Sequence, residues 1–158
     1  MSTLARGQRG FTIAELLIAL ALMGFLMVAA ALGIQAAQTS YAYNSEKTDL
    51  VAKTRGTLDR ITQHIRMAAA FEVPDSGTLV VTLPNGSTHT YQWDGVANGN
   101  LTYTRVDDSP YNPVVLTDRV TTFVVTDVSP ACGVRLVLVG NRATTEATIT
   151  ATPRKAIY

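Results

Sequence analysis

Apolar residues dominate the first part of the chain. From Phe11 to Ile34 the sequence reads FTIAELLIALALMGFLMVAAALGI, which is 24 residues with one charged side chain, Glu15. As a helix this run would be about 36 Å long, and about 20 apolar residues are enough to cross the hydrocarbon core of a bilayer. The pattern therefore predicts a membrane-spanning helix over residues 11–34.

After residue 34 the composition becomes polar, but apolar residues still recur at helical spacing. No proline occurs before residue 74. The recurring apolar residues are Leu50, Leu58, Ile61, Ile65 and Ala68, and Val51, Leu58 and Ile65 lie seven residues apart. Such a stripe is typical of an amphipathic helix that covers a sheet. We therefore expect one helix over residues 11–70, whose second half, residues 35–70, forms the spine of a globular domain.

From residue 71 to 158 the pattern changes to short alternating runs that are separated by turn residues. Valine, threonine and tyrosine are frequent in these runs, and segments such as Pro84-Asn85-Gly86-Ser87 favour turns. We expect about six strands in an antiparallel meander, at residues 79–83, 88–93, 100–106, 119–128, 133–139 and 145–152. One face of this sheet would lie on the spine helix, which makes the fold class α+β.

The N-terminal run has three simpler interpretations. A secretory signal peptide has a shorter apolar core before its cleavage site, although the three alanines at 29–31 resemble such a site. A plain signal anchor fits the length, and a buried helix of a soluble protein would carry more polar residues. Glu15 separates these interpretations, because an ionised carboxylate in a membrane segment costs about 2.5–3.5 kcal/mol and a plain anchor gains nothing from it.

Basic residues flank only the start of the apolar run. Arg6 and Arg9 precede it, and the next lysine or arginine is Lys47. The positive-inside rule therefore predicts that the N-terminus lies in the cytoplasm and the C-terminal domain outside. We expect a single-pass protein of the cytoplasmic (inner) membrane.

The segment RGFTIAELLIALALMGFL resembles the class III signal of type IV prepilins and of type II secretion pseudopilins. In that family a short basic leader ends in glycine, an apolar residue follows, and the fifth residue of the mature chain is glutamate. The matching positions here are a leader over residues 1–10 with Arg6 and Arg9, then Gly10, Phe11 and Glu15. The resemblance implies a pilin-like fold, leader cleavage after Gly10 by a prepilin peptidase, and N-methylation of Phe11 by the same enzyme.

Glu15 gains a partner in this interpretation. Cleavage creates an α-amino group on Phe11 that is positively charged at neutral pH. In a filament the Glu15 carboxylate can pair with that ammonium group on a neighbouring subunit. Because an unpaired member of a buried ion pair is costly, this pair would fix the axial register between subunits during assembly.

The resemblance also implies partners and a site of helix flexibility. In related major pilins a glycine and a proline in the apolar half allow local melting; Gly24 matches the glycine, whereas Leu32 and Gly33 stand near the place of the proline. We therefore expect flexibility at Gly24 and Gly33. The expected partners are the prepilin peptidase and N-methyltransferase, other pilin or pseudopilin subunits, the inner-membrane assembly platform, and membrane lipid before assembly.

The C-terminal half is similar to minor pilins and to J-type minor pseudopilins, through a YTR strand, a GVRLVL strand and a TATPRK close. The paired-cysteine loop of many major pilins is missing, since Cys132 is the only cysteine and cannot form an internal disulfide. We expect a minor subunit of a type IV pilus or related filament. The alternatives are a minor pseudopilin of type II secretion and a tip module for binding, adhesion or DNA uptake.

Candidate chemistry beyond assembly is sparse. The 13 basic residues include Arg6 and Arg9, so a product that starts at Phe11 carries 11 basic and 12 acidic side chains, a balance that argues against direct nucleic-acid binding. His64 is expected at the surface or the domain edge, and His89 lies in a strand without nearby cysteine or carboxylate. We expect no enzyme activity, no cofactor and no metal site.

Two further groups of side chains could form local sites. Asp107 and Asp108 could contribute oxygen ligands to a calcium site, although adjacent aspartates are more often part of a solvated turn. Tyr91, Trp93 and Tyr103 are expected to form an aromatic cluster across neighbouring strands.

Overall fold

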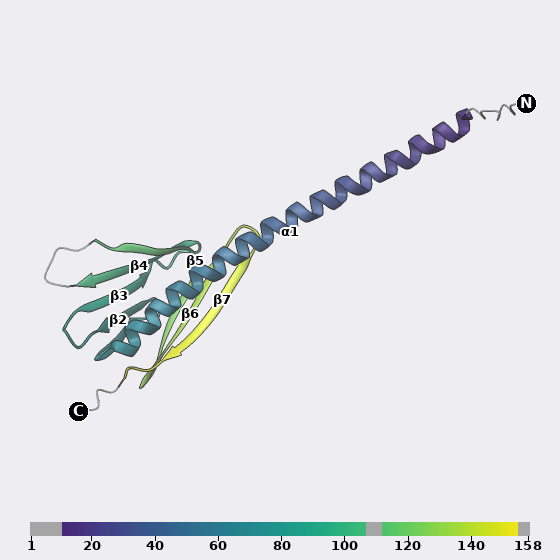
Figure 1. Ribbon diagram of the computed structural model, residues 1–158. Helices are drawn as coiled ribbons and strands as arrows, with labels where there is room; N and C mark the ends of the chain where they lie inside the picture. The colour runs from purple at the N-terminus through teal and green to yellow at the C-terminus, as the bar shows by residue number, and fades with distance from the viewer. Residues whose placement is uncertain (1–10, 107–111, 155–158) are drawn as a thin grey trace, which may run out of the picture. The chain divides into compact units, whose positions relative to one another are not determined.

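The computed structural model describes residues 11–106 and 112–154 (Figure 1). The chain forms two compact units, residues 1–42 and 43–158. The described residues begin with one long helix, α1 (Ile13–Met67), and continue with seven strands. These strands are β1 (Ala70–Asp75), β2 (Thr78–Thr82), β3 (Thr88–Trp93), β4 (Gly99–Val106), β5 (Val114–Val128), β6 (Ala131–Val139) and β7 (Thr144–Ala151).

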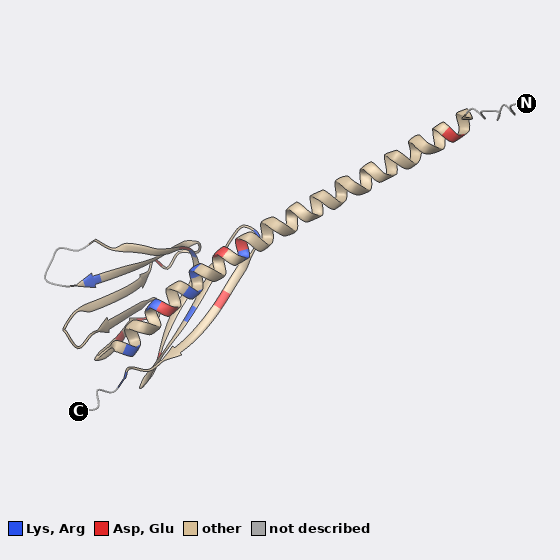
Figure 2. Cartoon of the chain, in the orientation of Figure 1, with Lys and Arg blue, Asp and Glu red and all other residues tan. Residues whose placement is uncertain are grey.

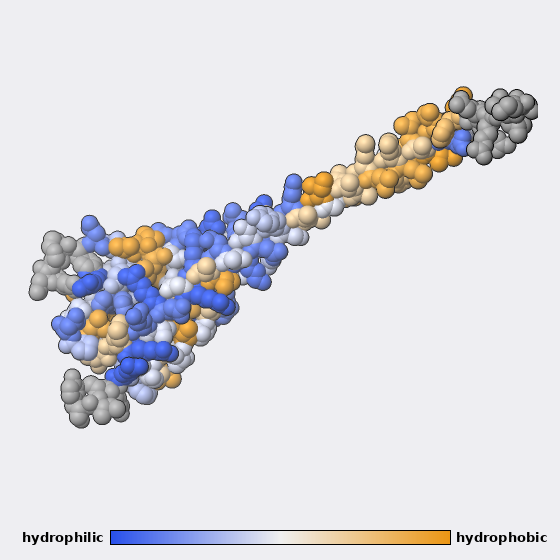
Figure 3. All heavy atoms as spheres, viewed as in Figure 1, coloured by the Kyte–Doolittle hydropathy of each residue, from blue (hydrophilic) through white to orange (hydrophobic). Residues whose placement is uncertain are grey.

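The described part of the first unit consists of the N-terminal part of α1. Every residue from 11 to 40 is exposed, and Glu15 is the single charged residue among them (Figure 2). Apolar side chains cover this helix up to Ile34, which is the orange and pale orange stretch in Figure 3. A helix that is apolar all round needs an apolar environment, and this one is long and apolar enough to cross a membrane.

In the second unit, the seven strands form one antiparallel sheet in the order β1-β2-β3-β4-β5-β6-β7. Each strand therefore pairs with its neighbours in the sequence, which confirms the predicted meander and the α+β fold class. The pairing is regular between β2 and β3 and between β6 and β7, and it shifts within the pair of β4 and β5.

The sheet has one strand more than the sequence indicated. Residues 70–75 carry Pro74 and two acidic side chains and were not predicted as a strand, yet they form β1 at the edge of the sheet. An edge strand tolerates proline because one side of its backbone needs no partner. This strand also shortens the expected helix, since α1 ends at Met67 and β1 begins at Ala70.

Strand β5 is also longer than predicted, because it starts at Val114 rather than at residue 119. Asp118 and Arg119 interrupt the apolar alternation, and Arg119 has a φ of 61°. The pairing of β5 with both neighbours shifts near this point. Such an irregularity breaks the alternation of apolar and polar positions, so the periodicity does not show that the strand is continuous.

The core of the second unit lies between α1 and the inner face of the sheet. The predicted helical stripe is confirmed at Leu50, Leu58, Ile61, Ile65 and Ala68, which are all buried, whereas Val51 is only partly buried. Sequence analysis did not include two threonines, Thr54 and Thr57, which are buried on the same face. Thr54 remains compatible with the core because its hydroxyl donates to the backbone oxygen of Leu50 at 2.8 Å. The sheet contributes Leu79, Tyr91, Leu101, Phe123, Val134, Leu136 and Leu138.

Glu46 connects α1 to the turn between β6 and β7. Its carboxylate accepts hydrogen bonds from the backbone N–H groups of Asn141, at 2.7 Å, and Arg142, at 2.8 Å. The Arg119 guanidinium lies 3.4 Å away, and the Glu46 side chain is only 15% exposed. A Cβ at Gly140 would collide with this carboxylate, so glycine at position 140 lets the Glu46 side chain reach the turn without shifting.

Candidate functional site

The first turn of α1 is closed by a reciprocal pair of hydrogen bonds between Thr12 and Glu15. The backbone N–H of Glu15 donates to the Thr12 hydroxyl at 3.3 Å, and the backbone N–H of Thr12 donates to the Glu15 carboxylate at 3.0 Å. The Thr12 hydroxyl also donates to that carboxylate, at 3.1 Å. This is a capping box, which satisfies two backbone donors that the helix itself leaves free.

Glu15 is both a capping residue of α1 and an exposed carboxylate. The carboxylate has partners within its own helix, and it lies near the positive end of the helix dipole, which favours a negative charge. It is also exposed and therefore accessible to a second subunit. Sequence analysis missed this arrangement, although the spacing of threonine and glutamate at i and i+3 is its known signature.

Phe11 precedes this turn, and its side chain is 83% exposed. Gly10, Arg6 and Arg9, which the prepilin resemblance assigns to the leader, lie outside the described residues. The pairing of Glu15 with a neighbour's Phe11 ammonium involves a second chain, and it stays a prediction.

Gly24 and Gly33 both lie inside α1. A Cβ at either position would meet nothing within 4 Å. Packing within the chain therefore gives no reason for glycine at these two positions. Glycine destabilises a helix interior by about 1 kcal/mol relative to alanine. Local flexibility at Gly24 and Gly33 therefore stays a prediction.

A second polar group lies between α1 and the strands β3 and β4. The Tyr91 hydroxyl is 2.6 Å from Nδ1 of His64, and the Tyr103 hydroxyl is 2.6 Å from Nδ1 of His89. The two imidazole rings lie 4.3 Å apart between centroids. We call these four residues the His–Tyr cluster. It joins the helix to the sheet through side chains that hydrogen-bond within the core.

Of the two locations expected for His64, the surface and the domain edge, the His–Tyr cluster rules out the open surface. This residue is half-buried rather than a surface residue, and burial lowers the pKa of its imidazole to about 4, with the nearby charges of His89, Arg60 and Arg105 acting in the same direction. Burial likewise raises the pKa of the Tyr91 hydroxyl. Both groups are therefore neutral at ordinary pH. His64 follows the buried Ile61 by three residues, which is the signal that could have placed it on the inner face.

The expected aromatic cluster is present in part. Tyr91 and Tyr103 face each other across β3 and β4, with ring centroids 5.3 Å apart. Within the described residues, their other ring contacts are with His64 and His89, and Trp93 pairs across the strands with Leu101 instead. The Arg60 guanidinium lies over the Tyr103 ring, 4.2 Å from its centroid, which adds a cation–π contact.

The described residues offer little for metal or nucleophilic chemistry. They contain no group of three or more histidine, cysteine or carboxylate side chains that could hold a metal ion. Asp107 and Asp108, the candidate calcium ligands, lie outside the described residues. Cys132 is buried in the sheet, and burial raises the pKa of its thiol to about 11, so it acts as a small core residue.

Comparison with known proteins gives one match. The model of the prokaryotic N-terminal methylation motif matches residues 5–31, a segment that includes Gly10, Phe11 and Glu15. No curated protein and no solved structure matches the chain. The motif belongs to subunits that are structural rather than catalytic, that a prepilin peptidase processes, and that assemble with other pilins.

Proposed function

We propose that this type IV pilin-like prepilin works as a minor subunit of a type IV pilus or a related filament. The match of residues 5–31 to the N-terminal methylation motif carries the proposal. The motif coincides with the start of an apolar helix that can anchor the chain in a membrane. The broader statement, that the chain is a pilin or pseudopilin-like subunit, follows from the motif by itself.

Maturation would take place at the cytoplasmic face of the inner membrane. The prepilin peptidase would cleave after Gly10, remove the leader with Arg6 and Arg9, and methylate the new N-terminus at Phe11. Glycine suits the bond that is cut, because it lets the backbone adopt conformations that other residues resist. Until assembly, residues 11–34 would keep the subunit in the lipid, with its C-terminal domain outside.

Assembly would then transfer the apolar helix from lipid into the filament core, with the inner-membrane assembly platform as a partner. The exposed apolar side chains of α1 provide the surface for this packing. Among these apolar side chains Glu15 is charged. Its carboxylate would leave the capping box and pair with the Phe11 ammonium group of a neighbouring subunit. Both charges would then be compensated in the apolar core.

Two features favour a minor subunit over a bulk one. Cys132 is buried in strand β6 and has no second cysteine in the chain, so the disulfide loop of many major pilins is not formed. The strands of the C-terminal half also resemble those of minor pilins. The same strands resemble J-type minor pseudopilins, which makes a minor subunit of type II secretion the second candidate.

N-terminal processing tests the proposal. Mass spectrometry of the protein extracted from membranes should find a chain that begins at Phe11 and carries a methyl group on its α-amino nitrogen. A Gly10→Leu variant should keep Met1 at its start, because the peptidase needs glycine before the cleaved bond. A wild-type chain that begins near Ala31, or that is never cleaved, would refute the proposal.

A further inference from the structure

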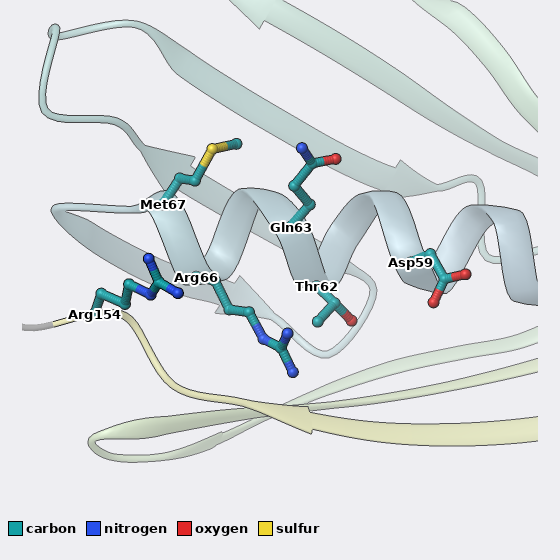
Figure 4. Close-up of a pocket in the computed structure, with 6 residues that line it drawn as sticks. All are labelled: Asp59, Thr62, Gln63, Arg66, Met67 and Arg154. Atoms are coloured by element: carbon teal, nitrogen blue, oxygen red, sulfur yellow. The ribbon is translucent and has the colours of Figure 1, made fainter.

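A groove of about 370 Å³ lies beside the C-terminal end of α1 (Figure 4). Its lining combines two arginines with other polar side chains and one methionine: Asp59, Thr62, Gln63, Arg66, Met67 and Arg154. The proposed assembly through the N-terminal helix uses none of these residues. The groove lies within the second unit of the chain, residues 43–158.

The main chain holds the two arginines of the groove side by side. Arg66 is in the last turn of α1, and Arg154 follows the end of β7. The backbone N–H of Arg154 donates to the backbone oxygen of Arg66 at 3.1 Å, so the two residues are joined directly although 88 positions separate them. Figure 4 shows the Arg154 side chain extending from the strand end toward the helix, on the side from which Arg66 projects.

Neither guanidinium has an ion-pair partner within residues 11–106 and 112–154. The ion pairs found there use Lys53, Arg119 and Arg135 as their cations. Asp59 also lines the groove, but it precedes Arg66 by seven residues, which is about 10 Å along a helix. The groove therefore carries two positive charges at one end and one negative charge at the other.

These groups match a carboxylate. Guanidinium groups bind carboxylates and phosphates through paired N–H donors, and two of them line this groove. Asp59 reduces the summed charge of the groove to +1, which suits a single carboxylate better than a doubly charged phosphate or a polyanion. The Met67 side chain, which is 46% exposed, adds an apolar surface for the methylene groups that carry such a carboxylate.

We propose that this groove binds the carboxylate of an aspartate or glutamate side chain on a neighbouring subunit. The assignment of a subunit as the partner rests on the proposed function, because filament assembly brings C-terminal domains of copies or relatives of this chain together. A chain that begins at Phe11 has more acidic than basic side chains, so such a neighbour supplies carboxylates. The groove would thus add a polar contact to the assembly made by the apolar helix.

Titration of the full chain in detergent micelles tests carboxylate binding directly. The probe is an acetylated, amidated Ala-Glu-Ala-Glu-Ala peptide, and the matched neutral peptide has glutamine in place of glutamate. Ionic strength is held constant because salt screens exposed charges. The Nε–H signals of Arg66 and Arg154 should shift saturably in the NMR spectrum with the acidic peptide, and neither should shift with the neutral one.

Three substitutions locate the binding to the groove. Arg66→Gln and Arg154→Gln should each weaken peptide binding about tenfold, as expected for losing a charge-assisted hydrogen bond. Arg55→Gln removes the same charge from an exposed position of the same helix outside the groove, and it should change binding by less than about twofold. Asp59→Asn should strengthen binding, because it removes a repulsive charge.

The outcomes separate this proposal from the proposed function. Unshifted signals of Arg66 and Arg154, or an equal effect of Arg55→Gln, would overturn the groove as a carboxylate site. Tighter binding of inorganic phosphate than of the peptide would overturn the acidic partner. Processing at Phe11 is followed in the same variants: normal processing without peptide binding counts against the groove alone, and binding without processing counts against the proposed function alone.

Discussion

Glu15 faces two different surroundings at the start of α1. In the single chain, Thr12 donates two hydrogen bonds to its carboxylate, one from the backbone and one from the hydroxyl. These bonds offset part of the cost of a charge in an apolar segment. In a filament the carboxylate would exchange them for the ammonium group of a neighbour's Phe11. The negative charge should therefore matter more for assembly than the hydrogen-bonding capacity.

Replacing Glu15 should impair assembly without releasing the protein from the membrane. Glu15→Leu removes a charge that opposes insertion, and cleavage after Gly10 should persist. Incorporation into filaments should fall strongly, because an unpaired buried charge costs about 3–5 kcal/mol. Comparing the membrane fraction with the sheared-filament fraction, while following cleavage, measures both effects.

Two further variants distinguish charge pairing from capping. Glu15→Gln keeps an acceptor for the Thr12 donors but has no charge, so it should assemble as poorly as Glu15→Leu. Thr12→Val removes the hydroxyl and leaves the carboxylate, so it should assemble better than either. A Thr12→Val variant that fails as completely as Glu15→Leu would identify the cap as the essential feature.

The His64 imidazole loses its proton at a lower pH in the folded chain than in the unfolded chain. Its pKa falls from 6.5 to about 4 in the folded chain, so the unfolded chain binds more protons between these two values. Stability is then complete above pH 6.5 and decreases as the pH falls toward 4. The groups that face His64 act in the same direction, since Arg60, Arg105 and a protonated His89 all repel an imidazolium ion.

Acid should therefore weaken the C-terminal domain measurably. Between pH 6.5 and 4 we expect His64 to reduce the free energy of unfolding by about 1–3 kcal/mol, after allowance for its partial exposure to solvent. Urea unfolding of the sheet, followed by circular dichroism at several pH values, measures this loss.

His64→Gln is the control for this pH dependence. Glutamine can still accept a hydrogen bond from the Tyr91 hydroxyl, and it does not titrate. The variant should show a flatter dependence of stability on pH between 4 and 6.5, whatever its stability at neutral pH. An unchanged pH dependence would mean that another group is responsible.

At the scale of the elements, Glu46 joins α1 to the turn between β6 and β7. The contact spans 95 and 96 positions of sequence and lies at the N-terminal edge of the second unit, which begins at Tyr43. The hydrophobic core of the same helix begins only at Leu50. Glu46 is thus the hydrogen-bonded attachment of the helical turn that precedes the core.

Removing this attachment should loosen the turn locally. In Glu46→Gln the amide can accept one hydrogen bond where the carboxylate accepted two, so the backbone amides of Asn141 and Arg142 should exchange with solvent about tenfold faster. Gly140→Ala should have a similar effect, because its Cβ would displace the carboxylate. Hydrogen exchange of the full chain in detergent measures both.

Gly133→Ala provides a control for the glycine substitution. A Cβ at Gly133, in β6, would meet its nearest neighbour at an ordinary 3.7 Å. Exchange at Asn141 and Arg142 should stay as in the wild type. Equal protection of these amides in Glu46→Gln and wild type would show that the carboxylate does not hold the turn.

At the scale of the whole molecule, the two units differ in the surroundings that they need. The described helix of residues 13–42 exposes apolar side chains and needs lipid or other helices around it. Residues 43–158 bury their own core between α1 and the sheet, with Tyr91, Phe123 and Ile61 among the fully buried side chains. The second unit should therefore fold without the first.

Removal of residues 1–38 tests this division. The remaining chain should be a soluble monomer with both helix and strand, because every core residue of the sheet and of the helical stripe is retained. Size exclusion and circular dichroism decide the question. Aggregation, or a spectrum with helix but no strand, would show that the apolar segment is needed for the domain to form.

Sequence alone determined the features that depend on local order. The apolar run of residues 11–34, the buried stripe at Leu50, Leu58 and Ile65, and the antiparallel meander all follow from periodicity and from the short connections between strands. The N-terminal motif was also readable, because its glycine, phenylalanine and glutamate lie within six consecutive residues. The capping box was equally local and was overlooked.

Only the tertiary structure decided which distant residues meet. His64 and Tyr91 are 27 positions apart, Glu46 and Asn141 are 95 apart, and Arg66 contacts Arg154 through the main chain. No periodicity links such pairs, because each depends on how the helix lies on the sheet. The edge strand β1 also depends on a distant contact: its alternation is limited to Phe71 and Val73, and pairing with β2 makes it a strand.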